Sequence, residues 1–158
     1  MLFRSEVGRF PPRDDSDRAA IVERLASSVY KQGELVRMNG DYATSVEHFL
    51  RVAQVAPTST IVPTARYDAA ADLLVLEDWS RAIVVLDAFR RDYPAHEYAA
   101  DVTAMLAVAY MSSGNGLMAA VEFERIAAGN EPADVRKEAL WQAATLYREG
   151  GQLADASR

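Results

Sequence analysis

The sequence contains no cysteine, which excludes disulfide bonds and thiolate metal sites. It has only two histidines, His48 and His96, and neither belongs to a His-Glu-x-x-His zinc motif. A glycine-rich phosphate loop is also missing, because residues 114–116 (Gly-Asn-Gly) lie between two helical patterns rather than between a strand and a helix. Glu122 and Glu124 are two apart on a predicted helix and so point to different faces. We therefore predict no catalytic residues, no metal site and no cofactor.

Clustered positive charge and long apolar runs are lacking as well. The net charge is −6 and the pI is about 4.9, whereas nucleic-acid binding needs a basic stripe that displaces counterions from phosphates. The longest apolar run, residues 104–111, is far shorter than the roughly 20 residues that span a bilayer. Residues 1–7 lack the apolar core of a signal peptide. We expect no nucleic-acid partner and no direct insertion into a membrane.

A repeat of 37 residues organises what is present. The turn positions are Gly40, Glu77, Gly114 and Gly151. The small residues seven positions before each turn are Gly33, Ala70, Ala107 and Ala144. The small residues five positions after each turn are Ser45, Ala82, Ala119 and Ala156. Small side chains at helical spacing are where two helices cross closely, so one unit is a helix, a turn and an antiparallel helix.

Prolines follow the second helix of each unit, at Pro57, Pro94 and Pro132, and proline cannot continue a helix. The patterns predict an all-α array of antiparallel helix pairs. Seven full helices are expected, at about residues 16–38, 41–55, 62–76, 79–92, 96–112, 117–128 and 133–149.

The third unit carries Leu106-Ala107-x-x-Tyr110 followed by Ala119-x-x-x-Phe123. This pattern resembles the tetratricopeptide repeat, a family of α-helical protein-binding solenoids. The phrases at residues 79–83 and 89–94, with their Tyr-Pro stop, are similar to bacterial cell-envelope members, the lipoprotein of the outer-membrane barrel-assembly machine and the Tol–Pal-associated coordinator. The resemblance implies that the helix pairs form a right-handed superhelical solenoid and that this solenoid is a protein-binding scaffold.

The expected organisation is an unstructured lead over residues 1–14 and a repeat domain over residues 15–158. Three complete units, 26–62, 63–99 and 100–136, precede a truncated fourth, 137–158. We expect residues after Gly151 to be frayed or ordered by another molecule, and the chain to be a fragment of a longer repeat protein. The uncovered apolar face at that end, which carries Trp141, is a possible site of self-association.

The first helix of each unit is expected to line a concave groove, with inward positions at i, i+4 and i+7. These positions hold Tyr30, Glu34 and Arg37; Tyr67, Ala71 and Leu74; Ala104, Val108 and Met111; and Trp141, Thr145 and Arg148. Tyr30, Tyr67 and Trp141 are the predicted aromatic anchors for a peptide or helix of a partner. A chaperone-type carboxylate clamp is rejected, because acids such as Glu34, Asp68 and Asp101 lie where that clamp needs bases.

The favoured function is a protein-interaction scaffold in bacterial envelope assembly, periplasmic or associated with the outer membrane. Two alternatives remain open at this point. One is the helical accessory domain of an envelope enzyme such as a lytic transglycosylase, and the other is a cytoplasmic regulatory scaffold.

Overall fold

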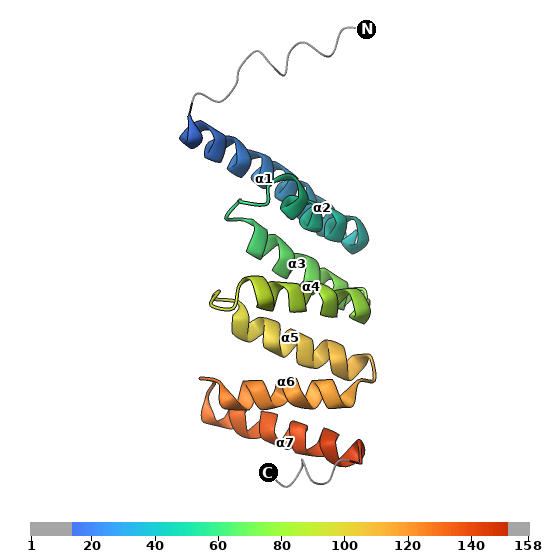
Figure 1. Cartoon of the computed structure of the whole chain (residues 1–158). Helices are drawn as coiled ribbons and strands as arrows, with labels where there is room; N and C mark the ends of the chain where they lie inside the picture. The colour runs from blue at the N-terminus through green and yellow to red at the C-terminus, as the bar shows by residue number, and fades with distance from the viewer. Residues whose placement is uncertain (1–13, 152–158) are drawn as a thin grey trace.

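The computed structural model describes residues 14–151, and this part of the chain is a single column of helices with no strand. The helices are α1 (Asp15–Met38), α2 (Tyr42–Val55), α3 (Val62–Val75), α4 (Trp79–Asp92), α5 (Ala99–Ser112), α6 (Gly116–Ala128) and α7 (Ala133–Glu149). Each helix packs against the next one along the chain, and α3 also touches α5 (Figure 1). The predicted solenoid of antiparallel helix pairs is confirmed. The fraying predicted after Gly151 falls on residues 152–158, outside the described residues.

The turn that follows each first helix has a residue with positive φ at the same place in the repeat. The residues with positive φ are Gly40, Glu77, Gly114 and Gly151, with φ of 79°, 56°, 78° and 76°. After the first three, the next residue caps the following helix: Asp41, Asp78 and Asn115 each accept a hydrogen bond from the backbone N–H three residues on, over 3.0, 3.2 and 3.4 Å. Such N-caps satisfy amides that the first helical turn leaves without a partner. Local chemistry therefore sets where α2, α4 and α6 begin.

The helix α5 begins at Ala99, and the predicted start at residue 96 was wrong. The reason is the turn after Pro94, in which the His96 amide donates to the Tyr93 carbonyl over 3.1 Å. The His96 ring packs against Phe89 and Tyr98, with centroids 5.4 and 4.8 Å away. His96 therefore belongs to the aromatic packing of the α4–α5 loop and does not open the helix.

The small residues of the repeat lie in the core, where neighbouring helices pack closely. Gly33, Ala70 and Ala107 are all buried, and a Cβ added to Gly33 would lie only 2.7 Å from the Phe49 ring. Two large clusters of buried apolar side chains result, one shared by α1, α2 and α3 and the other running from α2 to α6. A smaller cluster joins α6 to α7. These clusters fix the position of the first helix of each pair, α1, α3, α5 and α7, and the predicted groove residues lie on these four helices.

Candidate partner-binding surface

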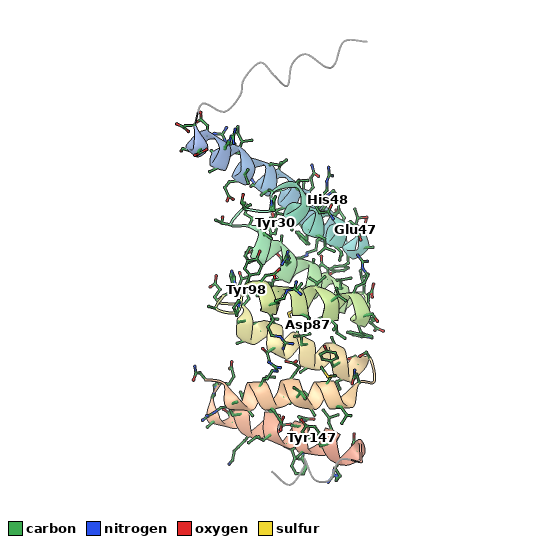
Figure 2. All side chains as sticks on the ribbon, in the orientation of Figure 1. Tyr30, Glu47, His48, Asp87, Tyr98 and Tyr147 are labelled. Carbon is green, nitrogen blue, oxygen red and sulfur yellow. The ribbon has the colours of Figure 1, made fainter. Side chains whose placement is uncertain are left out.

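Two of the predicted groove residues on α1 are engaged with α3. The Tyr30 hydroxyl donates to Asp68 Oδ2 over 2.5 Å. Tyr30 is labelled in Figure 2. The Arg37 guanidinium lies 3.1 Å from Asp68 Oδ1 and 2.9 Å from Asp72 Oδ1, and the buried Ser45 hydroxyl donates to Asp72. Glu34 is exposed between them. Tyr30 and Arg37 therefore join the first two helix pairs.

This network also governs the titration of the two α1 side chains. Burial, followed by the hydrogen bond to Asp68, raises the pKa of the Tyr30 phenol well above its ordinary value. Burial alone would lower the pKa of the Arg37 guanidinium, but its contacts with Asp72 and Asp68 raise it instead. Both side chains are thus held in the protonated form by their surroundings.

The corresponding residues of α3 are also partly covered. The Tyr67 ring packs on the Tyr98 ring with centroids 4.5 Å apart, and burial raises the pKa of the Tyr67 phenol. Leu74 packs against the larger core cluster, and Ala71 is half-buried. The joint between the second and third pairs is therefore filled by the chain's own aromatic rings.

On α5 the equivalent positions are open. Val108 and Met111 expose 43% and 45% of their surfaces, and Ala104 is exposed as well. On α7, Trp141 is 63% exposed, Arg148 is exposed and Thr145 is half-buried. The structure thus divides the predicted stripe into a half on α1 and α3, where Tyr30, Arg37 and Tyr67 contact other residues of the chain, and an open half on α5 and α7.

A cleft continues the open half. It has a volume of about 500 Å³ and lies between the start of α5, the end of α6 and the start of α7. Its apolar walls come from Ala99, Ala100, Ala104, Ile126 and Val135. Asp101, Arg125 and Glu131 are its charged lining residues. We call this space the α5–α7 cleft.

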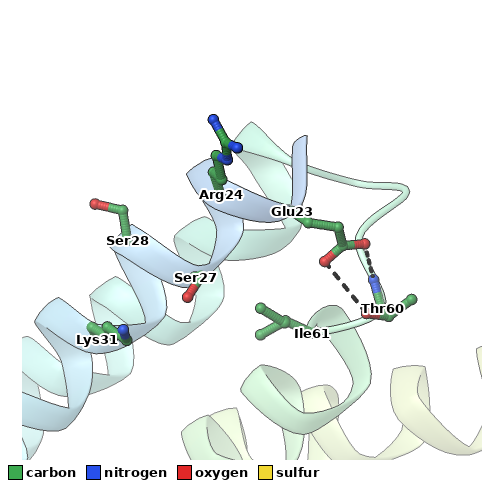
Figure 3. Close-up of a pocket in the computed structure, with 7 residues that line it drawn as sticks. All are labelled: Glu23, Arg24, Ser27, Ser28, Lys31, Thr60 and Ile61. Atoms are coloured by element: carbon green, nitrogen blue, oxygen red, sulfur yellow. Dashed lines mark hydrogen bonds between the residues drawn. The ribbon is translucent and has the colours of Figure 1, made fainter. Parts of the chain in front are cut away.

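A second cleft, of about 580 Å³, lies between α1 and the start of α3 (Figure 3). Arg24, Lys31 and two serines line it on the α1 side. Its one carboxylate, Glu23, accepts hydrogen bonds from the Thr60 amide over 2.9 Å and the Ser59 hydroxyl over 2.8 Å, and these bonds lower the pKa of the Glu23 carboxyl. These bonds keep Glu23 ionised, and with Arg24 and Lys31 against this one carboxylate the lining residues of the α1–α3 cleft carry a net positive charge.

The sequence did not predict the burial of the Glu122 carboxylate on α6. Glu122 is fully buried, and its Oε2 accepts from Arg90 Nη1 over 2.7 Å. Arg125 Nε lies 3.6 Å from the same oxygen, while Glu122 Oε1 is buried without a hydrogen-bond partner. Glu124, two residues on, faces α7 and accepts from the Tyr147 hydroxyl. The two acids contact different helices and do not converge on a shared substrate site.

Metal-ligand clusters and membrane-spanning helices are absent from residues 14–151. No three side chains of metal-ligating type come together there. Within the same range, every helix is too short or too polar to cross a bilayer.

Comparison with known proteins bears on the whole array. The model of a family described as "YfiO: Outer membrane lipoprotein" matches residues 23–149. A solved structure, "MamA 41-end from Desulfovibrio magneticus RS-1", aligns with a TM-score of 0.59 at 19% identity, over 84% of this chain and 70% of that chain. A likeness at this identity supports the fold alone. No curated protein matches the sequence.

Proposed function

Because this chain belongs to the YfiO family of outer membrane lipoproteins, we propose that it is a protein-interaction scaffold of bacterial envelope assembly. It binds a polypeptide segment of its partner along the open positions of α5 (Ala104, Val108 and Met111, called the α5 row) and of α7 (Trp141). It performs no chemistry on that segment. The family match favours this role over the two alternatives, the accessory domain of a lytic transglycosylase and a cytoplasmic regulator.

One observation carries the choice of surface. Tyr30 and Arg37 on α1 contact Asp68 of α3, and the Tyr67 ring on α3 packs on the Tyr98 ring just before α5. The matching residues on α5, Ala104 and Met111, leave their surfaces to solvent. Exposed apolar positions that adjoin a cleft are typical of a partner-binding site.

The chemistry of this surface suits a polypeptide. Met111 is flexible and polarisable, so it adapts to different side chains, and Val108 and Ala104 add apolar area beside it. The Trp141 ring gives a large contact area at a small cost in conformational entropy. A small polar metabolite would need convergent polar groups in an enclosed site, and the α5 row carries apolar side chains.

Site-specific photocrosslinking tests the proposal. A benzophenone amino acid replaces Val108 on α5 or, as a matched control, Val84 on α4, which is a valine 69% exposed on a second helix. After irradiation in cells, we expect polypeptide adducts at position 108 and not at position 84, and mass spectrometry identifies the partner.

A substitution that places a charge on the α5 row is the second test of the proposal. Val108→Asp is expected to weaken capture of that partner by roughly tenfold, because a desolvated charge is placed in an apolar contact. Val84→Asp should leave capture unchanged. Equal adducts at positions 84 and 108, or full capture by Val108→Asp, would show that the α5 row is not the binding surface.

A further inference from the structure

The α5–α7 cleft has a filled counterpart one repeat earlier. Ala104 and Val135, which line the cleft, lie 37 residues after Tyr67 and Tyr98 respectively. Those two tyrosines pack on each other at the joint between α3 and α5, with ring centroids 4.5 Å apart. The same position in the repeat is therefore occupied by two aromatic rings at one joint and is open at the next.

The preceding joint shows that the position is not always aromatic. Ile61, 37 residues before Tyr98, lines the α1–α3 cleft. Tyr30, 37 residues before Tyr67, packs its ring on Phe49 with centroids 5.1 Å apart and donates its hydroxyl to Asp68. The Tyr67–Tyr98 contact is thus specific to the middle joint. It shows which kind of group fits between successive first helices in this chain.

We propose that the α5–α7 cleft receives an aromatic side chain of the partner, in the place that the chain's own tyrosines fill at the α3–α5 joint. The cleft walls are alanine, isoleucine and valine side chains, which suit the face and edge of a ring. A space of about 500 Å³ holds a ring and part of the neighbouring residue. This inference rests on the proposed function and names the partner's anchor.

The charged residues that line the α5–α7 cleft favour one kind of side chain next to the partner's aromatic anchor. Asp101 and Glu131 line the cleft, and the single base, Arg125, has its Nε 3.6 Å from the buried carboxylate of Glu122. The free charge at the α5–α7 cleft is therefore negative, opposite to that of the α1–α3 cleft with Arg24 and Lys31. A basic residue next to the aromatic anchor is favoured, and an acidic one is disfavoured.

Dipeptide probes test this directly. We would titrate ¹⁵N-labelled protein with N-acetyl-tyrosyl-arginine amide, N-acetyl-tyrosyl-glutamate amide and N-acetyl-alanyl-arginine amide, and follow backbone amide shifts by NMR. The tyrosyl-arginine probe is expected to move the amides of residues 99–104 and 125–135, with a dissociation constant on the order of 1 mM. It should bind at least threefold more tightly than either of the others and leave residues 24–31 unmoved.

Two double variants and one control separate the roles of shape and charge. Ala104→Tyr combined with Val135→Tyr copies the middle joint into the cleft, and it should reduce probe affinity at least tenfold. The control, Val84→Tyr, adds the same side chain at an exposed valine on α4, outside the cleft, and should bind the probe as wild type does. Asp101→Asn combined with Glu131→Gln changes little in shape, and it should abolish the preference for arginine over glutamate.

Each other result overturns the inference. These results are no shifts at the cleft, equal shifts with the alanyl probe, or unchanged binding by the tyrosine-filled variant with a wild-type-like spectrum. The proposed function has its own readout in the Val108 adducts. Adducts without probe binding refute only the aromatic anchor, whereas probe binding at the cleft without adducts refutes only the binding row.

Discussion

Arg37 and Arg90 each hold buried or half-buried carboxylates at a joint between helix pairs. Arg37 joins α1 to Asp68 and Asp72 of α3, and Arg90 joins α4 to Glu122 of α6. A buried ion pair adds little net stability, because desolvation offsets much of the attraction, but removing one partner leaves the other charge buried and unpaired. We therefore regard these pairs as contacts that select one packing of the units.

The pair on α4 and α6 gives the first prediction. Arg90→Met should lower the free energy of unfolding by about 2–4 kcal/mol, because Glu122 then keeps only its longer contact with Arg125. The double variant Arg90→Met/Glu122→Met should recover most of this loss. Urea denaturation measures both, and a double variant no more stable than Arg90→Met would contradict the explanation.

Tyr30 gives a prediction about pH. Its pKa is raised in the folded protein, so the phenol contributes fully to stability below the unfolded-state pKa of about 10. Above that pH the unfolded chain loses its proton first, and stability falls until the folded pKa is passed. Wild-type stability should therefore drop more steeply between pH 9.5 and about 11 than that of Tyr30→Phe.

Urea melts at several pH values check this difference. Tyr42→Phe on α2, outside the Asp68 network, serves as the matched control and should follow the wild-type profile. If Tyr30→Phe loses stability with pH as steeply as wild type does, the shifted phenol is not the cause.

At the scale of elements, the turn after each first helix is the most regular part of the chain. Three of its four positive-φ residues are glycine, and the fourth is Glu77 at φ 56°. A side chain in the left-handed region costs about 1–2 kcal/mol, while glycine loses more backbone entropy on folding. Glu77→Gly should therefore stabilise the protein by about 0.5–1 kcal/mol.

The reverse change provides the control. Gly114 has φ of 78° and no atom within 4 Å of an added Cβ, so Gly114→Ala should cost about 1 kcal/mol through the backbone alone. Thermal melts of both variants measure the two effects. A destabilised Glu77→Gly protein would mean that the Glu77 side chain makes contacts that outweigh the strain.

The helices were predictable from the sequence because their limits depend on neighbouring residues. Glycine turns and Asp or Asn caps lie within a few residues of the ends that they define. The start of α5 was missed because the His96 ring packs against Phe89, seven residues away, and Tyr98. Helical periodicity contains no information on such ring contacts.

At the scale of the whole molecule, sequence spacing predicts which residues share a helix face but not what they contact. Tyr30, Arg37 and Tyr67 have their partners Asp68 and Tyr98 31–38 residues away in the sequence. Only the fold reveals that these side chains contact other residues of the chain. The burial of Glu122 was not predicted for the same reason, since its partner Arg90 belongs to another helix pair.

Contacts in this solenoid connect mainly successive helices, so its stability is approximately a sum of neighbour terms. The cluster that runs from α2 to α6 contains the largest set of buried side chains, whereas α7 is held by a small cluster on α6. Leu86 lies fully buried in the first and Ala143 is buried in the second. A substitution that removes packing should therefore destabilise many helices when it lies in the central cluster, and only neighbouring helices when it lies at the α7 end.

Hydrogen exchange measured by mass spectrometry tests this difference. Leu86→Ala should cost about 2–5 kcal/mol by leaving a cavity and should speed amide exchange throughout α2 to α6. Ala143→Gly should cost about 1 kcal/mol through helix propensity and speed exchange in α6 and α7 while α2 and α3 keep wild-type protection. Equal loss of protection along the chain in both variants would show that the array unfolds as one cooperative unit, because neighbour-by-neighbour stability requires the α7 change to fade with distance.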